Sequence, residues 1–97
     1  MMEELTEQDI QEYRDDIALA LTEIETREDL THFVKMLNWG YENGLYEEQS
    51  VSDYLGGTCG LLMSLDSWYR NRGKTESPDE PTWTMFAEIL LASFYHS

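Results

Sequence analysis

The sequence has little positive charge: six Lys and Arg residues stand against twenty Asp and Glu, and the formal net charge is −14. A chain this acidic repels phosphate backbones and anionic membrane surfaces, so direct binding of nucleic acid or membrane is not expected. The charge is uneven, because residues 1–48 carry −11 and residues 49–97 carry −3. We expect the cluster of Arg70, Arg72 and Lys74 to complement a helix end and to form salt bridges.

Cysteine occurs once, at Cys59, which excludes an internal disulfide and a cysteine-based zinc site within these 97 residues. A single cysteine fits a reducing compartment, and we expect a cytoplasmic protein. No apolar run approaches the roughly 18 residues that indicate a membrane-spanning helix. The opening MMEELTEQD is acidic, and we expect no signal peptide there.

Enough apolar material is present for one core, since 41% of the residues are hydrophobic and 12% are aromatic. The length predicts one domain over residues 1–97. Four segments have apolar residues at helical spacing. The pattern predicts an all-α, compact four-helix domain with helices at about 7–24, 27–42, 51–71 and 83–95.

Helix starts are marked by a repeated signal. Thr6, Thr26 and Ser50 are each followed three residues later by aspartate, an Asp variant of the capping box. Glycines at 56, 57 and 60 interrupt the third helix, and each costs a helix about 1 kcal/mol relative to alanine. They predict either close contact with a neighbouring helix or a kink near Gly56–Gly57.

The last two predicted helices have broad apolar faces, which we expect to be buried. The third face comprises Val51, Tyr54, Leu55, Leu61, Leu62, Leu65, Trp68 and Tyr69. The fourth comprises Trp83, Phe86, Ala87, Leu90 and Phe94.

Four pieces of the sequence share a pattern with a known group of proteins. They are TREDLTHFV at 26–34, SVSDYL at 50–55, LDSWYRNRG at 65–73 and PTWTMFAEILLAS at 81–93. Over about residues 26–94 the chain resembles a family of short, acidic bacterial domains without an assigned function. The resemblance implies a bacterial or phage origin and a common fold, and it transfers no functional residue.

Signals for an enzyme are weak, and we expect no catalytic activity, cofactor or metal. The GGTCG at 56–60 lies within helical periodicity, so Cys59 is expected to be structural. His32 is the only plausible base in a folded part of the chain, and we expect it to be at the surface or half-buried. Four carboxylates lie near one another in the sequence, but their spacing does not match a calcium-binding loop.

The segment 39–54 combines three tyrosines and a tryptophan with four acids around a predicted loop. Such a mixture is typical of protein interfaces, because aromatic rings provide contact area and carboxylates grip Lys and Arg. The expected partner-binding residues are Trp39, Tyr41, Glu42, Tyr46, Glu47, Glu48 and Asp53. The alternative is that Tyr41 and Tyr54 are core residues at helix ends.

The acidic charge and this segment together predict a small protein-binding inhibitor. In chemistry the chain resembles the small acidic helical immunity proteins of bacterial nuclease toxins, so the expected partner is a cationic nuclease toxin. Three alternatives remain: a phage-type DNA mimic, with the acids of 7–24 as one row of charges, a structural or oligomerising adaptor, and a small enzyme using Cys59. The oligomeric state stays open.

Overall fold

The computed structural model describes residues 4–75, 77 and 79–95, and within them it contains five α-helices and no strand. The helices are α1 (Glu7–Thr22), α2 (Arg27–Glu42), α3 (Val51–Met63), α4 (Leu65–Asn71) and α5 (Trp83–Ser93). The all-α prediction is confirmed, whereas the prediction of four helices is wrong, because the third segment forms two helices.

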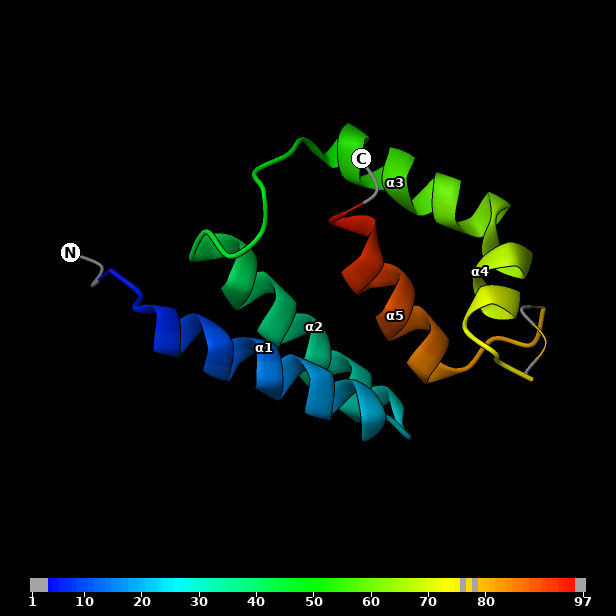
Figure 1. Ribbon diagram of the computed structural model, residues 1–97, viewed down its shortest axis with the longest axis horizontal. Coiled ribbons are helices and arrows are strands. Elements are labelled where there is room, and N and C mark those ends of the chain that lie inside the picture. The colour runs from blue at the N-terminus through cyan, green and yellow to red at the C-terminus, as the bar shows by residue number, and fades with distance from the viewer. Residues whose placement is uncertain (1–3, 76, 78, 96–97) are drawn as a thin grey trace.

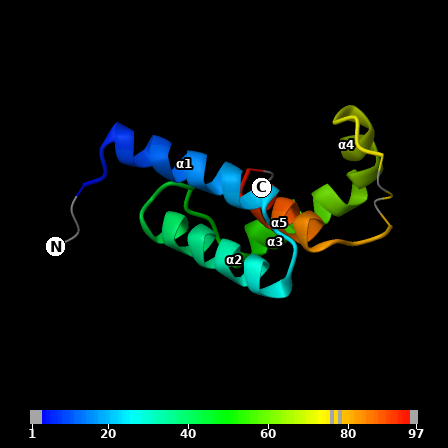
Figure 2. The ribbon, with the colours of Figure 1, turned by 90° about the horizontal axis from the view of Figure 1, so that it is seen from below.

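The helices form two groups joined by α5. Figures 1 and 2 show α1 and α2 side by side and antiparallel, with α5 lying between this pair and α3. Helix α5 packs against α1, α2 and α3, while α4 extends from the end of α3. The last helix of the chain therefore forms the centre of the fold.

The break in the third predicted helix lies at Ser64. The Ser64 hydroxyl donates to the Gly60 carbonyl oxygen at 2.9 Å, and its backbone leaves helical geometry with ψ at 14°. A serine hydroxyl that bonds back to the carbonyl four residues earlier competes with the helical ladder and bends the chain. The predicted kink near Gly56–Gly57 is wrong, since both glycines lie within α3.

The predicted capping boxes are confirmed at Thr6 and Thr26, and at Ser50 only the hydroxyl half of the box forms. At the start of α1, the Thr6 hydroxyl accepts from the Asp9 backbone at 3.1 Å, and the Asp9 carboxylate accepts from the Thr6 backbone at 3.0 Å. Thr26 and Asp29 form the same reciprocal pair at α2. Backbone hydrogen bonds lower the pKa of both carboxyls. The backbone N–H of Thr6 has this effect on Asp9, and that of Glu25 has the largest effect on Asp29. One-sided caps begin α3 and α5, at Ser50 and Thr82.

The core has two parts. The larger is centred on Phe33, which is fully buried, and joins α1, α2 and α5. Its buried members are Tyr13, Ile17, Ile24, Phe33, Leu37, Tyr46 and Ala87. The smaller part joins α4 to α5, and its buried members are Leu65, Tyr69, Met85 and Ile89.

Part of the predicted buried faces lies at the surface. The residues that are exposed against prediction are Val51, Leu55, Leu62, Trp83 and Phe86. Helix α3 packs on α5 along one side only, and no described helix covers its opposite side. The apolar pattern of α3 is therefore wider than the surface that α5 can bury.

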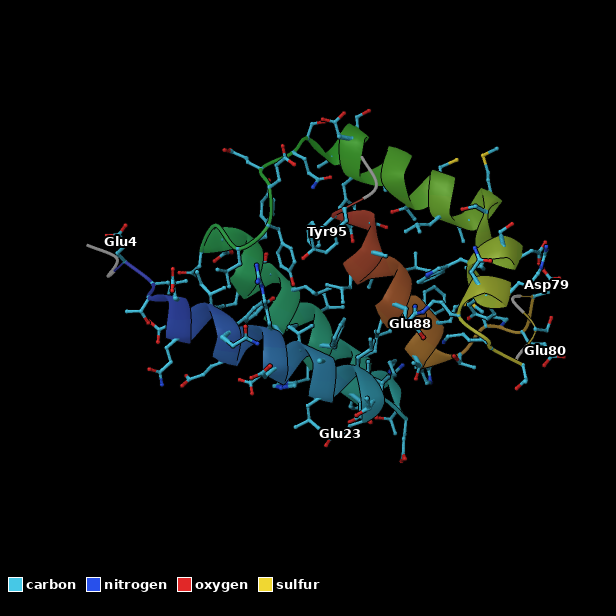
Figure 3. All side chains as sticks on the ribbon, in the orientation of Figure 1. Glu4, Glu23, Asp79, Glu80, Glu88 and Tyr95 are labelled. Atoms are coloured by element: carbon cyan, nitrogen blue, oxygen red, sulfur yellow. The ribbon has the colours of Figure 1, made fainter. Side chains whose placement is uncertain are left out.

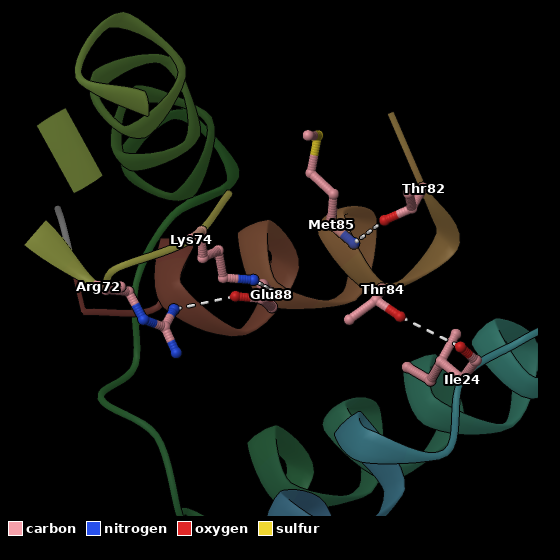
Figure 4. A network of polar contacts seen from close by, with 7 residues as sticks. All are labelled: Ile24, Arg72, Lys74, Thr82, Thr84, Met85 and Glu88. Atoms are coloured by element: carbon pink, nitrogen blue, oxygen red, sulfur yellow. Dashed lines mark hydrogen bonds and ion pairs between the residues drawn. The ribbon is translucent and has the colours of Figure 1, made fainter. Parts of the chain in front are cut away.

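A buried carboxylate fixes the segment after α4. Glu88 of α5, with a side chain only 5% exposed, is held by Arg72 at 2.9 Å and Lys74 at 2.7 Å (Figure 4). The two cations also lie over rings, Arg72 over Trp68 and Lys74 over Tyr69. The predicted salt bridges of Arg72 and Lys74 are thus confirmed.

A tyrosine pair links α1 to the loop after α2. The Tyr13 hydroxyl donates to the Met36 carbonyl at 2.9 Å and lies 3.0 Å from the Tyr46 hydroxyl, which therefore donates to it. Gly40 of α2 is buried directly beneath both rings. A side chain at this position would meet Tyr13 and Tyr46, which explains a glycine in the middle of a helix.

The tyrosine pair predicts sensitivity to alkali. Burial raises the pKa of Tyr13 and Tyr46, so the unfolded chain releases its tyrosine protons at lower pH than the folded protein does. The free energy of unfolding should therefore fall above pH about 10, by about 1.4 kcal/mol per pH unit for each tyrosine that stays protonated. Urea unfolding between pH 8 and about 11 measures this slope. The double variant Tyr13→Phe/Tyr46→Phe should show a shallower slope, and an unchanged slope would contradict the assignment.

Candidate protein-binding groove

An apolar groove lies between α2 and α3, with α5 between its walls. Its volume is about 300 Å³. Helix α2 and α3 make no helix–helix contact with each other, and the loop 43–50 closes one end. The groove is lined by Val34, Leu37, Asn38, Tyr41, Gln49, Ser50, Val51, Tyr54, Leu90 and Phe94.

Two tyrosines hold the walls of this groove. The Tyr41 hydroxyl donates to the Gln49 carbonyl at 3.0 Å, and the Tyr54 hydroxyl donates to the Leu90 carbonyl at 2.6 Å. Phe94 of α5 stacks on Tyr41 and meets Tyr54 edge to face. Burial raises the pKa of Tyr54. Because both hydroxyls are engaged with the backbone, these tyrosines line the groove mainly as apolar surface.

The structure places the predicted aromatic binding residues in three different environments. Tyr41 lines the groove, as just described. Trp39 is 45% exposed, but its ring lies 5.5 Å from that of Tyr13, on the side of α2 that faces α1. Tyr46 is buried in the core, so its prediction as a contact residue is wrong: the hydroxyl pairing with Tyr13 and stacking on Phe94 draw its ring inward.

The four predicted carboxylates are all exposed. They are Glu42, Glu47, Glu48 and Asp53. Glu42, Glu48 and Asp53 stand next to groove residues in the chain, and Glu47 lies two positions before Gln49. Glu42 also accepts a hydrogen bond from Asn38 at 3.0 Å. Lys35, a cation of α2, lines the hollow between α1 and α2 and not the groove. The rim of the groove is therefore predominantly negative.

Gln49 is a groove residue that sequence reasoning missed. Its side-chain nitrogen donates to the Phe94 carbonyl at 3.1 Å and to the Glu47 carbonyl at 3.3 Å. Its Oε1 is buried and is the only such side-chain atom without a hydrogen-bond partner among the residues that the structure describes. A glutamine in a polar loop carries no sequence signal that would separate it from solvent-exposed neighbours.

Negative charge covers most of the surface. In the described part of the chain, every Asp and Glu is exposed except Asp29 and Glu88. Figure 3 shows Glu4, Glu23, Asp79 and Glu80 at the outer edges of the molecule. Three of the six cations form ion pairs with carboxylates of the same chain: Arg27 pairs with Glu28, and Arg72 and Lys74 both pair with Glu88. The surface therefore keeps a large uncompensated negative charge.

Several apolar side chains of α3 are exposed. Val51 and Met63, at its two ends, are 75% and 84% exposed. Cys59 lies on this helix and is exposed. The region 4–75, 77 and 79–95 contains no group of three potential metal ligands, and none of its helices has the length and apolarity needed to cross a membrane.

These features define a small all-α domain with an apolar groove inside an acidic surface. The chain belongs to a family of unknown function (DUF7660), which matches residues 26–96. The match includes α2 to α5 and hence every residue of the groove, while α1 precedes it. No curated protein and no solved structure matches the chain.

Proposed function

We propose that this protein is an inhibitor that binds a cationic protein, and that its partner is a bacterial nuclease toxin which it neutralises as an immunity protein. The observation that carries the proposal is the uncompensated surface charge: nearly all described carboxylates are exposed, while the one buried glutamate takes up two of the six cations. A surface of this kind attracts a positive partner over long range.

A nuclease offers the matching surface. Its substrate cleft is positive because it must hold phosphates. An acidic domain that covers this cleft, or lies beside it, excludes the substrate without chemistry of its own. Complementary charge also speeds the encounter, toward about 10⁸ M⁻¹s⁻¹ at low salt. Rapid capture is what protection of a cell from its own toxin in the cytoplasm requires.

Salt dependence of association tests this proposal. The probe is a small basic protein that this chain captures from its native host, purified and assayed for nuclease activity with and without the acidic protein. The activity should be lost at a one-to-one ratio. The association rate should fall by about tenfold or more between 0.05 and 0.5 M salt, because the Debye length drops from above 10 Å to under 5 Å. A rate that does not depend on salt contradicts charge steering.

Matched charge reversals locate the contact. Glu47→Lys/Glu48→Lys changes the rim of the groove, and Glu23→Lys/Glu25→Lys makes the same charge change at the far end of α1 and α2. The rim variant should weaken binding about tenfold at 0.15 M salt, while the control should weaken it about twofold, since distant charges are screened. Equal effects would place the interface elsewhere. Competition by duplex DNA at unrelated DNA-binding proteins would favour the DNA-mimic alternative.

A further inference from the structure

We infer that the groove between α2 and α3 binds one face of an amphipathic α-helix, whose flanking lysines and arginines meet the carboxylates of the rim. The inference rests on the proposed function, because it takes the same cationic partner. It adds which surface is used, what secondary structure enters it and which side chains lie inside.

The lining requires an apolar occupant. Val34 and Leu37 come from α2, Val51 from α3, and Leu90 and Phe94 from α5. Val34 is 41% exposed and Val51 75% exposed, so both walls leave apolar surface in water. Covering this surface with apolar side chains removes it from water, which is the main driving force of association.

The hydrogen bonding of the walls favours a helix over an extended segment. The hydroxyls of Tyr41 and Tyr54 already donate to backbone carbonyls, and the Gln49 carbonyl already accepts from Tyr41. An extended peptide would bring backbone groups that this apolar lining cannot satisfy. No sheet edge is present in the described residues to pair with it. A helix satisfies its own backbone and presents apolar side chains at every third or fourth position.

The groove is large enough to hold the apolar side chains of a bound helix but too small to hold the whole helix. About 300 Å³ of space lies between two helical walls and opens to solvent. A helix resting on α2 and α3 would stand about 8–10 Å from each axis and send its apolar residues inward. Its remaining face would stay in water, which is where its cations reach the rim.

Charge at the rim selects a cationic helix. The exposed carboxylates of Glu42, Glu48 and Asp53 adjoin groove residues in the chain, and that of Glu47 lies two positions from Gln49. The nearby cation of α2, Lys35, lines the hollow between α1 and α2 instead. Lysine and arginine side chains beside the apolar stripe form charge-assisted hydrogen bonds with such carboxylates.

The unpaired Oε1 of Gln49 supplies a second, independent indication. This atom belongs to a groove residue and is buried without a donor. Buried polar atoms of native proteins are nearly always paired. A side-chain N–H or O–H of the bound helix that reaches this oxygen would complete its hydrogen bonding, while the Gln49 nitrogen keeps its bonds to Phe94 and Glu47.

Designed peptides test the inference. The probe is a fluorescein-labelled peptide of about 18 residues, with leucines along one helical face and lysines elsewhere. A second peptide has the same composition in an order that spreads the leucines around the helix, and a third replaces lysine by glutamate. The first should bind about tenfold tighter than the second in fluorescence anisotropy, and the third should not bind.

Two substitutions of equal charge identify the site. Val51→Arg places a cation in the groove, whereas Met63→Arg places one at the other end of α3, outside the lining. Both positions are exposed, so both variants should fold, as circular dichroism would verify. Val51→Arg should weaken binding of the leucine–lysine peptide about tenfold, and Met63→Arg about twofold or less.

The outcomes separate this inference from the proposed function. Equal binding of the two lysine peptides, or equal effects of the two substitutions, overturns the groove and leaves a cationic partner bound by charge alone. Failure of both lysine peptides to bind at 0.05 M salt overturns both ideas. A dimer of the protein alone that Val51→Arg dissociates would assign the groove to a second copy of the chain and overturn the helical ligand.

Discussion

Replacing Gly40 by alanine should lower the free energy of unfolding by about 2 kcal/mol, although alanine is the better helix former by about 1 kcal/mol. A Cβ at position 40 would lie 2.6 Å from Tyr13 Cζ and 2.8 Å from Tyr46 Cε2. These rings are buried and joined by a hydrogen bond, so neither can move aside without breaking the contact. Overpacking of a rigid core costs about 1–3 kcal/mol, and the lost hydrogen bond adds about 1 kcal/mol.

Gly56 provides the matched control. It also lies inside a helix, but nothing stands within 4 Å of a Cβ built there. Gly56→Ala should therefore raise the free energy of unfolding by about 1 kcal/mol through helix propensity alone. Urea unfolding of the two variants beside the parent measures both changes. A stability gain at both positions would show that α2 does not press on the tyrosine pair.

Sequence reasoning succeeds for features that depend only on residues close together in the chain. Local signals predicted what local physics decides: the hydroxyls of Thr6 and Thr26 cap the helices that follow them, and α2 has the predicted bounds. A capping bond joins residues three apart, so it can be seen in the sequence. Ser64 was missed because serine is common inside helices, and only its bond back to Gly60 shows that it ends one.

Non-local partners account for what could not be predicted. The periodicity of α3 indicates a helix, but it does not state how much of the apolar face a neighbour will cover. The glycines at 56, 57 and 60 were expected to mark close helix contact or a break. Gly57 is buried, in agreement with close contact, whereas Gly56 and Gly60 face open space within an intact helix. Tyr46 was assigned to the surface because its loop is acidic, and it is buried through contacts with Tyr13 and Phe94, which lie far away in the sequence.

The groove depends on such non-local packing as well. Tyr41 was predicted as a contact residue and lines the groove, while Leu90 was predicted only as part of a buried face. The groove exists because α2 and α3 both pack on α5 and not on each other. The spacing of residues within a single helix does not reveal that arrangement, so the apolar lining of the groove could not be predicted. The acidic residues near it could be predicted, because they are visible in the composition of segment 39–54.

Removing both cations around Glu88, as in Arg72→Met/Lys74→Met, should lower the free energy of unfolding by about 3–5 kcal/mol. The Glu88 carboxylate would stay nearly inaccessible to water and lose both of its ion pairs. The rings of Trp68 and Tyr69 would also lose the cations that lie over them. A loss of this size is a large fraction of the stability of a small domain.

Two further variants separate buried charge from lost packing. Adding Glu88→Met to the double variant removes the stranded carboxylate, and most of the stability should return, because apolar groups of similar size often replace buried ion pairs without loss. Arg14→Met/Arg70→Met removes two exposed cations that form no ion pair with a described carboxylate, and should change stability by about 0.5 kcal/mol or less. Urea unfolding at pH 7 compares all three. If the triple variant were as unstable as the double, the contribution of Arg72 and Lys74 would come from their contacts with the rings and not from neutralising Glu88.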